Sequence, residues 1–122
     1  MARIRTIKPE FYPVPTDGPV GTILTRMGRH PFRPAHIHFI VSAEGYDSCV
    51  THLFVKGGKY LDSDAVFGVK DSLIVDFKKI DSADEAKKAG LKAPFYRADF
   101  DFVLQPHAGG KAQKVISPAD AV

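Results

Sequence analysis

The 122-residue sequence contains no tryptophan and a single cysteine, Cys49. One thiol excludes an intramolecular disulfide, and its position inside an apolar run predicts a buried, unreactive side chain. No apolar stretch approaches the length of a membrane span, and the N-terminus has no secretory hydrophobic region. We therefore expect a cytoplasmic protein without a membrane segment.

Clusters of basic residues are also missing. The formal net charge is +3, from 17 Lys and Arg against 14 Asp and Glu, and no aromatic platform is interleaved with the basic residues. Nucleic acid is therefore not expected as a partner. Long helical stretches are absent too, because nine prolines and ten glycines divide the chain into short segments and loops. The length predicts one domain over residues 1–122.

What the sequence does have is a series of short alternating segments typical of β-strands. Strands are predicted at residues 3–7, 35–42, 48–55, 72–80 and 95–104. Residues 21–27 are predicted as a short strand or a single helical turn. One helix is predicted at residues 82–89, with Ser82 as its N-cap and Gly90 as its stop. The spacing of strands and turns predicts an all-β sandwich with one short helix.

The most distinctive motif is Arg-Pro-Ala-His-Ile-His at residues 33–38. On a strand, His36 and His38 face the same side, about 6.5–7 Å apart along the chain. Two imidazoles at that spacing can bind one metal ion. Neutral imidazole suits iron, zinc, copper and nickel, so the pair alone does not select a metal. Two ordinary histidines on a solvent-facing strand are the alternative.

Tyr12 lies in a proline-rich loop over residues 9–20, which is stiff enough to hold one side chain in a fixed place. A phenol becomes a ligand only when a strongly acidic cation displaces its proton. Fe(III) is hard and highly charged, and it suits a phenolate better than Zn(II) or Cu(I) does. Considered by itself, Tyr12 is also explained as a tyrosine half-packed in the loop.

Three longer motifs occur together in the chain. They are Tyr-Pro-Val-Pro-Thr-Asp-Gly-Pro-Val-Gly at residues 12–21, Gly-Arg-His-Pro-Phe-Arg-Pro-Ala-His-Ile-His-Phe at residues 28–39, and Leu-Asp-Ser-Asp-Ala-Val-Phe-Gly-Val-Lys at residues 61–70. With them, the sequence closely resembles the intradiol ring-cleaving dioxygenases, which cleave catechols between the two hydroxyl groups. Within that family it is most similar to the hydroxyquinol 1,2-dioxygenases. The resemblance implies a β-sandwich of the intradiol dioxygenase type.

Carried onto this sequence, the resemblance implies that Tyr12, His36 and His38 bind a non-haem Fe(III) ion. Tyr12 matches the family's axial tyrosinate, which leaves the metal when a catechol binds and can take a substrate proton. Arg33 matches the arginine that stabilises the anionic substrate, and a cation is most effective for this in a water-poor site. The implied reaction opens a small aromatic diol or triol with O2, and overall resemblance points to hydroxyquinol.

Two further residues are predicted to line the substrate pocket. His52 lies on the strand predicted after that of His38, where the family often places a polar pocket residue. Asp17 lies in a Pro-Thr-Asp-Gly turn near Tyr12. The alternatives are a solvent-facing histidine and an aspartate that only forms the turn. Asp62 and Asp64, on a later loop, are interpreted as carboxylates that bind backbone amides.

The sequence departs from the family pattern upstream of Tyr12. Family members place a second tyrosine ligand there, with further strands and a helical dimerisation region, and the chain has no match to them. We therefore expect an N-terminally truncated sandwich with impaired activity. Its exposed strand edges would pair with another copy, giving a homo-oligomer. Two other hypotheses remain: a His36–His38 module for a different divalent metal, and a non-catalytic β-sandwich.

Overall fold

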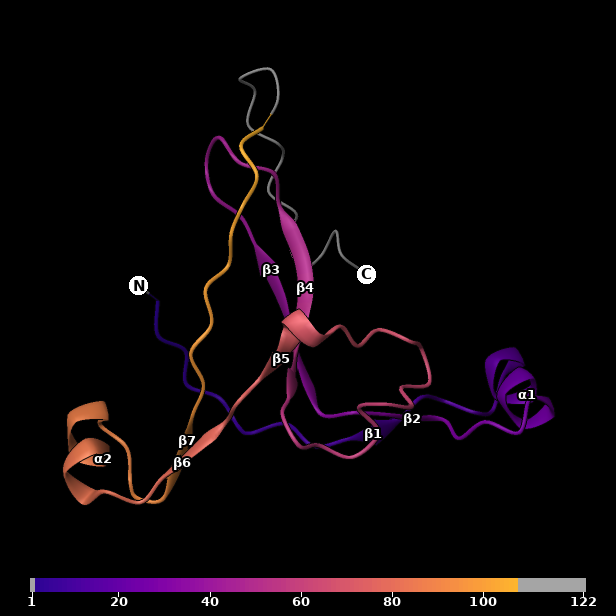
Figure 1. Cartoon of the computed structure of the whole chain (residues 1–122), viewed down its shortest axis with the longest axis horizontal. Helices are drawn as coiled ribbons and strands as arrows, with labels where there is room; N and C mark the ends of the chain where they lie inside the picture. Colours follow the sequence, from indigo (N-terminus) through magenta and orange to yellow (C-terminus); the bar gives the residue numbers. More distant parts are fainter. Residues whose placement is uncertain (1, 108–122) are drawn as a thin grey trace.

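The computed structural model describes residues 2–107, which form three small β-sheets and two α-helices (Figure 1). In chain order the elements are β1 (Tyr12–Pro13), α1 (Pro19–Arg26), β2 (Phe32–Arg33), β3 (His36–Val41), β4 (Cys49–Val55), the 3₁₀ helix η1 (Asp71–Leu73), β5 (Ile74–Val75), β6 (Lys78–Ile80), α2 (Ala83–Ala89) and β7 (Phe95–Arg97). The predicted all-β class is confirmed. The prediction of one domain also covers residues 108–122, which lie outside the described residues.

The central sheet has the strand order β3-β4-β5. β3 and β4 form an antiparallel pair in which His36 lies opposite Phe54 and His38 opposite His52. Their connection includes Gly45, whose φ of 81° lies in the left-handed region that glycine adopts without strain. β5 then pairs with β4 in the parallel direction. The two strands predicted from alternation at residues 35–42 and 48–55 are therefore confirmed to within a few residues.

A second, two-stranded sheet brings the first half of the chain beside the central sheet. β1 and β2 are antiparallel, with Tyr12 opposite Arg33. The pairing is extended by a hydrogen bond of 2.9 Å from the Val14 amide to the Pro31 carbonyl. Because β2 leads directly into β3, this register places Tyr12 next to the beginning of the histidine-bearing strand.

Helix α1 corrects the prediction of a strand or a single turn at residues 21–27. It spans eight residues, with Gly18 at the N-cap and Pro19 in the first turn, where proline is favoured because the missing amide has no intrahelical partner there. Gly21 lies directly against the backbone of Thr16, so that a Cβ atom would overlap it. Leu24 is the buried hydrophobic side chain of the helix.

Three predicted strands differ from the structure. Residues 3–7 form no regular element, residues 72–80 are divided between η1, β5 and β6, and only Phe95–Arg97 of residues 95–104 is a strand. Alternation reports which side chains face solvent, whereas a strand also needs a backbone partner. β6 and β7 find that partner in each other over three residue pairs.

The helix predicted at residues 82–89 is confirmed as α2. The Ser82 hydroxyl accepts a hydrogen bond of 3.4 Å from the Glu85 amide, and Gly90 ends the helix in the left-handed conformation. Among the described residues, no helix has the length and apolar character to cross a membrane.

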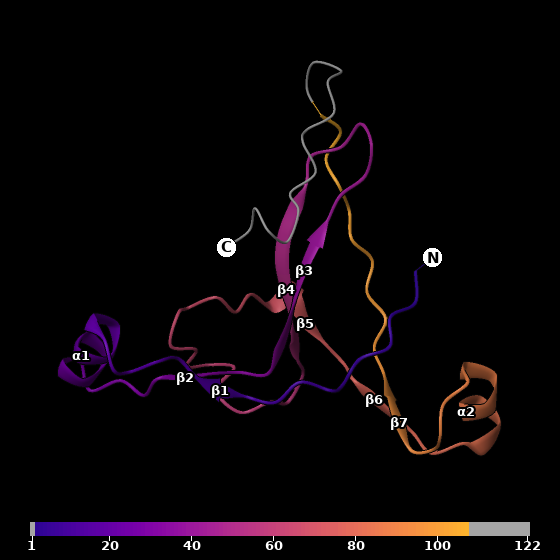
Figure 2. The same ribbon diagram turned by 180° about the vertical axis from the view of Figure 1, so that it is seen from behind.

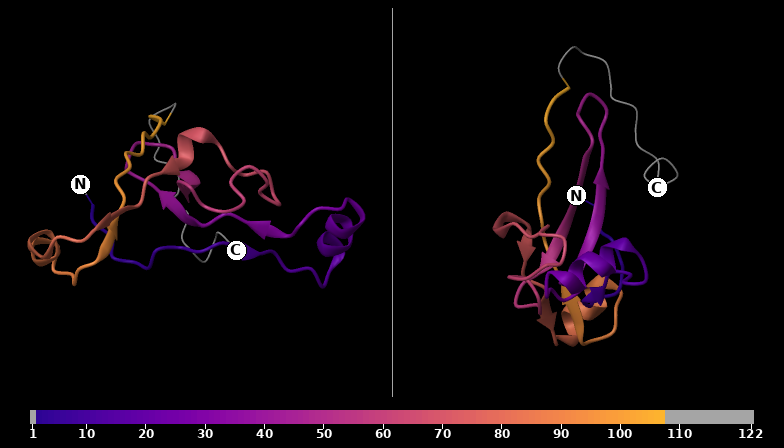
Figure 3. Two further views of the ribbon diagram at one scale, coloured as in Figure 1. Left: turned by 60° about the horizontal axis from the view of Figure 1, so that its bottom comes forward. Right: turned by 90° about the vertical axis from the view of Figure 1, so that its right-hand side faces the viewer.

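The described elements form three arms that meet beside β5 (Figures 1 and 2). One arm is the β3–β4 hairpin, another is β1, β2 and α1, and the third is β6, β7 and α2; Figure 3 shows the hairpin projecting away from the other two. Phe54 and Pro34 are the largest fully buried side chains. Cys49, at the start of β4, is half-buried rather than buried.

Candidate functional site

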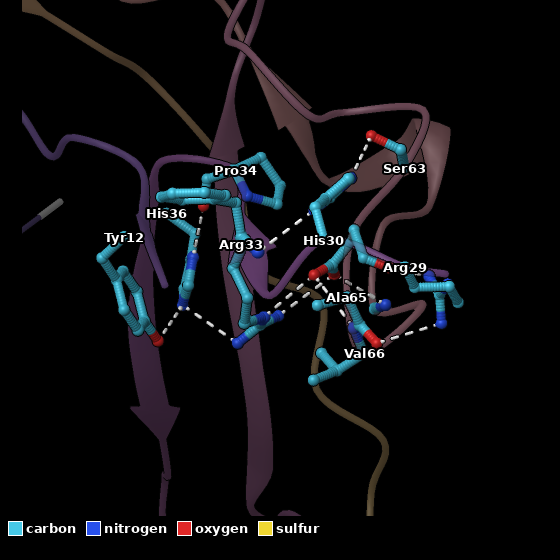
Figure 4. A network of polar contacts seen from close by, with 12 residues as sticks. Tyr12, Arg29, His30, Arg33, Pro34, His36, Ser63, Ala65 and Val66 are labelled. Atoms are coloured by element: carbon cyan, nitrogen blue, oxygen red, sulfur yellow. Dashed lines mark hydrogen bonds and ion pairs between the residues drawn. The ribbon is translucent and has the colours of Figure 1, made fainter. Parts of the chain in front are cut away.

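Three side chains from two separate sheets point toward one another. Tyr12 extends from β1, and His36 and His38 extend from the same face of β3. The Nε2 atoms of His36 and His38 are 3.1 Å apart, and the Tyr12 hydroxyl is 3.4 Å from Nε2 of His36. Figure 4 shows Tyr12 and His36 facing each other across the gap between their strands. The structure therefore brings together the three residues predicted as metal ligands.

A hydrogen bond on the side of the ring away from the site fixes the orientation of His36. Its Nδ1–H donates a hydrogen bond of 2.7 Å to the Pro34 carbonyl, which leaves the lone pair of Nε2 facing the site. Metal-binding histidines usually have such a second hydrogen bond, which sets the tautomer and the ring orientation. His36 is buried, and its ring packs against that of Phe54. The short Pro-Ala connection between β2 and β3 thus prepares His36 to act as an Nε2 donor.

The surroundings of His36 favour its neutral form. Burial lowers the pKa of His36, the nearby charge of Arg33 lowers it further, and the hydrogen bond to the Pro34 carbonyl opposes this change only in part. The neutral imidazole is the form that binds metal ions, because the proton and the metal compete for the same lone pair. His38 differs from His36 in being exposed.

Arg33 lies between the histidines and a buried carboxylate. Its Nη1 atom is 3.2 Å from Nε2 of His36, and the guanidinium also interacts with the Tyr12 hydroxyl. On its other side, Nε is 3.0 Å from Oδ1 of Asp64. Burial tends to lower the pKa of Arg33, but its contacts with Asp64 and Tyr12 outweigh burial and raise it. Arg33 therefore places a permanent positive charge at the site.

Asp64 has a larger role than the sequence predicted. It does bind backbone amides, those of Val66 and Gly68, as expected for a loop aspartate. It is also 3% exposed and pairs with Arg33, which is 31 residues away in the sequence. Burial raises the pKa of Asp64, but Arg33 and the two amides outweigh burial and lower it. Spacing and periodicity in the sequence carry no signal for a pair of residues so far apart. Asp62, on the same loop, is exposed.

His52 lies beside the two histidines of β3. Its ring centroid is 5.3 Å from that of His38 and 5.6 Å from that of His36. The Nε2 atom of His52 is buried, and among residues 2–107 it has no hydrogen-bond partner. Burial lowers the pKa of His52, and Arg33 lowers it further, whereas the Gly68 backbone acts in the opposite direction. The structure thus places a neutral imidazole with an unused polar atom next to the candidate ligands.

Asp17 lies apart from this group. It is exposed and lines an open hollow of about 410 Å³ between β1 and α1, together with neighbours such as Pro15 and Val20. Within residues 2–107, Asp17 forms no hydrogen bond or ion pair with Tyr12 or with the histidines. Its predicted place in a substrate pocket stays a prediction.

The donor set fits a metal ion that accepts both nitrogen and oxygen ligands. A separation of 3.1 Å between the Nε2 atoms of His36 and His38 is close to that of neighbouring ligands around an ion with bonds of roughly 2.0–2.1 Å. The part of the chain that the structure describes has no group of three or more His, Cys, Asp or Glu arranged for a metal. The Tyr12 phenol oxygen, 3.4 Å from Nε2 of His36, is the oxygen donor next to the two histidines, and a phenolate suits a hard, strongly acidic cation.

Two other histidines have local partners instead. Nε2 of His30 is 2.9 Å from the Ser63 hydroxyl, and the His30 ring packs on Tyr60. Nδ1 of His107 contacts a carboxylate oxygen of Asp47 near the turn of the β3–β4 hairpin. Neither ring lies among those of the candidate ligands, so both provide controls in tests of the site.

Comparisons with known proteins agree with this geometry. A family model described as "Dioxygenase" matches residues 1–106. Hydroxyquinol 1,2-dioxygenase from Rhizobium sp. is 54% identical over 101 residues, which cover 82% of this chain and 34% of the relative. 6-Chlorohydroxyquinol 1,2-dioxygenase from Cupriavidus pinatubonensis is 53% identical over 102 residues, covering 84% of this chain and 33% of the relative. The chain thus spans about a third of the length of the curated relatives it matches.

Solved structures give the same result. The hydroxyquinol 1,2-dioxygenase of Pseudomonas putida DLL-E4 superposes with a TM-score of 0.70 and 48% identity, over 82% of this chain and 35% of that one. Catechol 1,2-dioxygenase from Acinetobacter sp. ADP1 has a TM-score of 0.81 and 32% identity, over 91% of this chain and 36% of that one. These similarities confirm the predicted fold type. By sequence and by structure, the chain belongs to the intradiol ring-cleaving dioxygenases.

Proposed function

We propose that this chain contributes the iron-binding histidines and one tyrosine to an enzyme that cleaves a catechol-type ring between its two hydroxyl groups with O2. The observation that carries the proposal is the convergence of Tyr12, His36 and His38 at separations of 3.1 and 3.4 Å. The family uses a non-haem Fe(III) ion, and the mixed imidazole and phenol set suits that cation. When bound, Fe(III) supplies charge stabilisation and the redox chemistry that makes the chelated ring reactive.

The histidines and the tyrosine have different tasks in this proposal. His36 is buried and held by the Pro34 carbonyl, so it is the rigid donor. Tyr12 is 43% exposed and lies on a two-residue strand, so its ring has room to turn away. If a bound cation has displaced the phenol proton, the Tyr12 oxygen would then accept a proton from a substrate hydroxyl group, as a general base must do from within hydrogen-bonding distance.

Arg33 supplies the positive charge that this chemistry needs. Ring cleavage passes through an anionic substrate, and a fixed cation stabilises that charge most strongly where water is excluded. Arg33 is 7% exposed and lies beside both Tyr12 and His36. We therefore propose Arg33 and Tyr12 as the catalytic residues of the chain.

His52 and Asp17 are proposed as pocket residues. Buried polar atoms are nearly always paired. Because Nε2 of His52 has no partner within the described part of the chain, it is available to form a hydrogen bond to a substrate hydroxyl. Asp17 lines the separate hollow between β1 and α1 and is proposed to contact the part of a substrate farthest from the histidines. The similar proteins are named for hydroxyquinol, 6-chlorohydroxyquinol and catechol. A small aromatic diol or triol is therefore the proposed substrate, with hydroxyquinol first.

We also propose that copies of the chain associate through β3. This strand is at the edge of its sheet, with β4 on one side only. An edge strand presents unpaired amide and carbonyl groups to another chain. Concentration-dependent light scattering, compared between the chain and an Ile40→Lys variant on β3, tests this association.

The test of the main proposal combines colour, metal content and oxygen uptake. After reconstitution with Fe(III), the chain should hold one iron and show a visible tyrosinate-to-iron absorption band. Tyr12→Phe should abolish the band, and Tyr46→Phe, an exposed tyrosine in the connection between β3 and β4, should retain it. Oxygen uptake is then measured with hydroxyquinol and with catechol.

Two results would replace the proposal. A colourless protein with stoichiometric zinc would show that His36 and His38 serve a different divalent metal. A protein that takes up no metal at all would indicate a non-catalytic β-sandwich module.

A further inference from the structure

Each carboxylate oxygen of Asp64 accepts two hydrogen bonds. Oδ1 accepts hydrogen bonds from Arg33 Nε at 3.0 Å and from the Val66 amide at 3.2 Å. Oδ2 accepts from Arg33 Nη2 at 3.3 Å and from the Gly68 amide at 2.8 Å. Four donors therefore surround a carboxylate that is 3% exposed. A bidentate contact of this kind fixes the plane of a guanidinium as well as its position.

The bidentate contact leaves one guanidinium nitrogen for the site. Nε and Nη2 of Arg33 face Asp64. Nη1 lies 3.2 Å from Nε2 of His36, and Figure 4 shows Arg33 and His36 joined by this contact. Arg33 has several rotatable bonds, and without a partner behind it the charged end would sample many positions. The position of Nη1 next to the candidate ligands thus depends on the contact with Asp64.

The loop that carries Asp64 is itself attached to the strand of Arg33. Arg29 Nη2 donates to the Asp64 carbonyl at 3.0 Å, and the Ala65 amide donates to the Phe32 carbonyl at 3.1 Å. These bonds join the loop to β2 and to the residues just before it. Gly68 completes the enclosure, because a Cβ atom there would lie 3.0 Å from Arg33 Nη2 and 3.2 Å from Asp64 Oδ2.

We propose that Asp64 is the positioning residue of Arg33. Asp64 holds the guanidinium on the side facing away from the candidate ligands, so that Nη1 points to the place where the substrate binds. This inference rests on the proposed function, since it gives Arg33 the role of binding an anionic substrate. In this proposal Asp64 contacts neither the substrate nor the metal. Asp64 acts only by setting the direction in which the Arg33 guanidinium points.

The first measurement is made on the unaltered chain and does not depend on metal or activity. In ¹⁵N NMR, a guanidinium held by Asp64 gives a sharp Arg33 Nε–H signal that exchanges slowly with water. The signal is assigned by its loss in Arg33→Lys. Fast exchange of Arg33 Nε–H in the folded chain would overturn the proposal, whatever the fate of any Asp64 variant.

The second measurement uses Asp64→Asn with Asp62→Asn as the matched control on the same loop. Asp64→Asn keeps the shape of the side chain but replaces one acceptor with a donor that faces other donors. In the iron-loaded chain, its affinity for 4-nitrocatechol should fall about tenfold or more, while iron content and the tyrosinate-to-iron band stay unchanged. Asp62→Asn should bind 4-nitrocatechol as the unaltered chain does, because Asp62 is exposed.

A double-mutant cycle separates positioning from a purely structural role. In an Arg33→Ala background, Asp64→Asn should cause no further loss of 4-nitrocatechol affinity, because the group it positions is gone. Unchanged affinity in a folded Asp64→Asn single variant, or a full additional loss in the Arg33→Ala background, would overturn the proposal. If the unaltered chain binds neither iron nor 4-nitrocatechol, the proposed function fails, and the NMR measurement still decides the positioning.

Discussion

Phe54 lies directly opposite His36 in the β3–β4 pair, and its ring packs against the rings of both His36 and His52. Its centroid is 5.6 Å from that of His36 and 4.8 Å from that of His52, and the side chain has no exposed surface. Phe54 therefore belongs to the hydrophobic core and also supports the histidine rings of the candidate site. Stability and site geometry are coupled through it.

Truncation of this side chain should be costly. Phe54→Ala should lower the free energy of unfolding by about 3–5 kcal/mol, because it removes a fully buried ring and leaves a cavity. Urea unfolding measures the loss. Val50→Ala, an exposed position on the same strand, should change stability by less than about 0.5 kcal/mol. Equal effects of the two variants would show that the core is not centred on Phe54.

The two histidines of β3 should be needed for metal uptake. His36→Ala and His38→Ala should each reduce the iron bound per chain to well below one, measured by elemental analysis after reconstitution and buffer exchange, since each removes one of three donors. His107→Ala should retain full iron content because its ring contacts Asp47 near the hairpin turn. Iron retention in a folded His36→Ala variant would contradict the assignment.

The buried imidazoles should make stability depend on pH in the mildly acidic range. Burial lowers the pKa of His36 and of His52 in the folded chain below 6.5. The unfolded chain then binds more protons below about pH 6.5, so stability is complete above that value and is lost as the pH falls toward the lowered pKa. Urea unfolding between about pH 5 and 7.5 should show this slope.

A matched variant tests the source of this slope. His52→Gln should flatten the dependence of unfolding free energy on pH, because glutamine does not titrate. The carboxylate of Asp64 affects stability in a separate, more acidic pH range. Its pKa is lowered in the folded chain, so its contribution is present above about pH 4 and is lost as the pH falls through the lowered value. If the unfolding free energy of His52→Gln still changes with pH between about pH 5 and 7.5 as in the unaltered chain, groups other than His52 cause that change.

Gly68→Ala should disturb the site through space rather than charge. A Cβ atom there would lie 3.0 Å from Arg33 Nη2 and 3.1 Å from His52 Nε2, closer than ordinary packing allows. The expected loss of stability is about 1–3 kcal/mol, as for overpacked interiors. The control is Gly18→Ala, where no atom lies within 4 Å, and it should cost less, about 0.5–1 kcal/mol, because alanine is a poorer N-cap than glycine. Similar losses in both variants would contradict the close approach.

The sequence predicted the strands of the site better than its surroundings. β3 and β4 follow from alternating side chains joined by a glycine turn, and both signals are local. The roles of Tyr12 and Arg33 came from the family resemblance, because a tyrosine in a loop and an arginine beside a proline are common. The pairing of Arg33 with Asp64 was not predicted, because nothing in the intervening residues records that contact.

The helical and strand errors have physical causes as well. Residues 21–27 contain glycine and two threonines, which lower helix propensity, yet Pro19 and the contact of Gly21 with Thr16 stabilise the turn that begins α1. Residues 95–104 alternate throughout, but their backbone pairs with β6 only over Phe95–Arg97. Side-chain patterns describe exposure, and the partner strand decides where a sheet continues.

The pairing of β3 with β4 also makes the ligands vulnerable to an error that need not unfold the protein. His36 and His38 lie on one face of β3, with Phe54 and His52 opposite them on β4. A shift of β3 by a single residue would turn both imidazoles to the opposite face and present Ile37 and Phe39 to Tyr12 instead. Such a chain would keep its hairpin and its far-ultraviolet spectrum while losing every nitrogen ligand. The proposed metal centre would therefore depend on the correct alignment of two strands as well as on the presence of its residues.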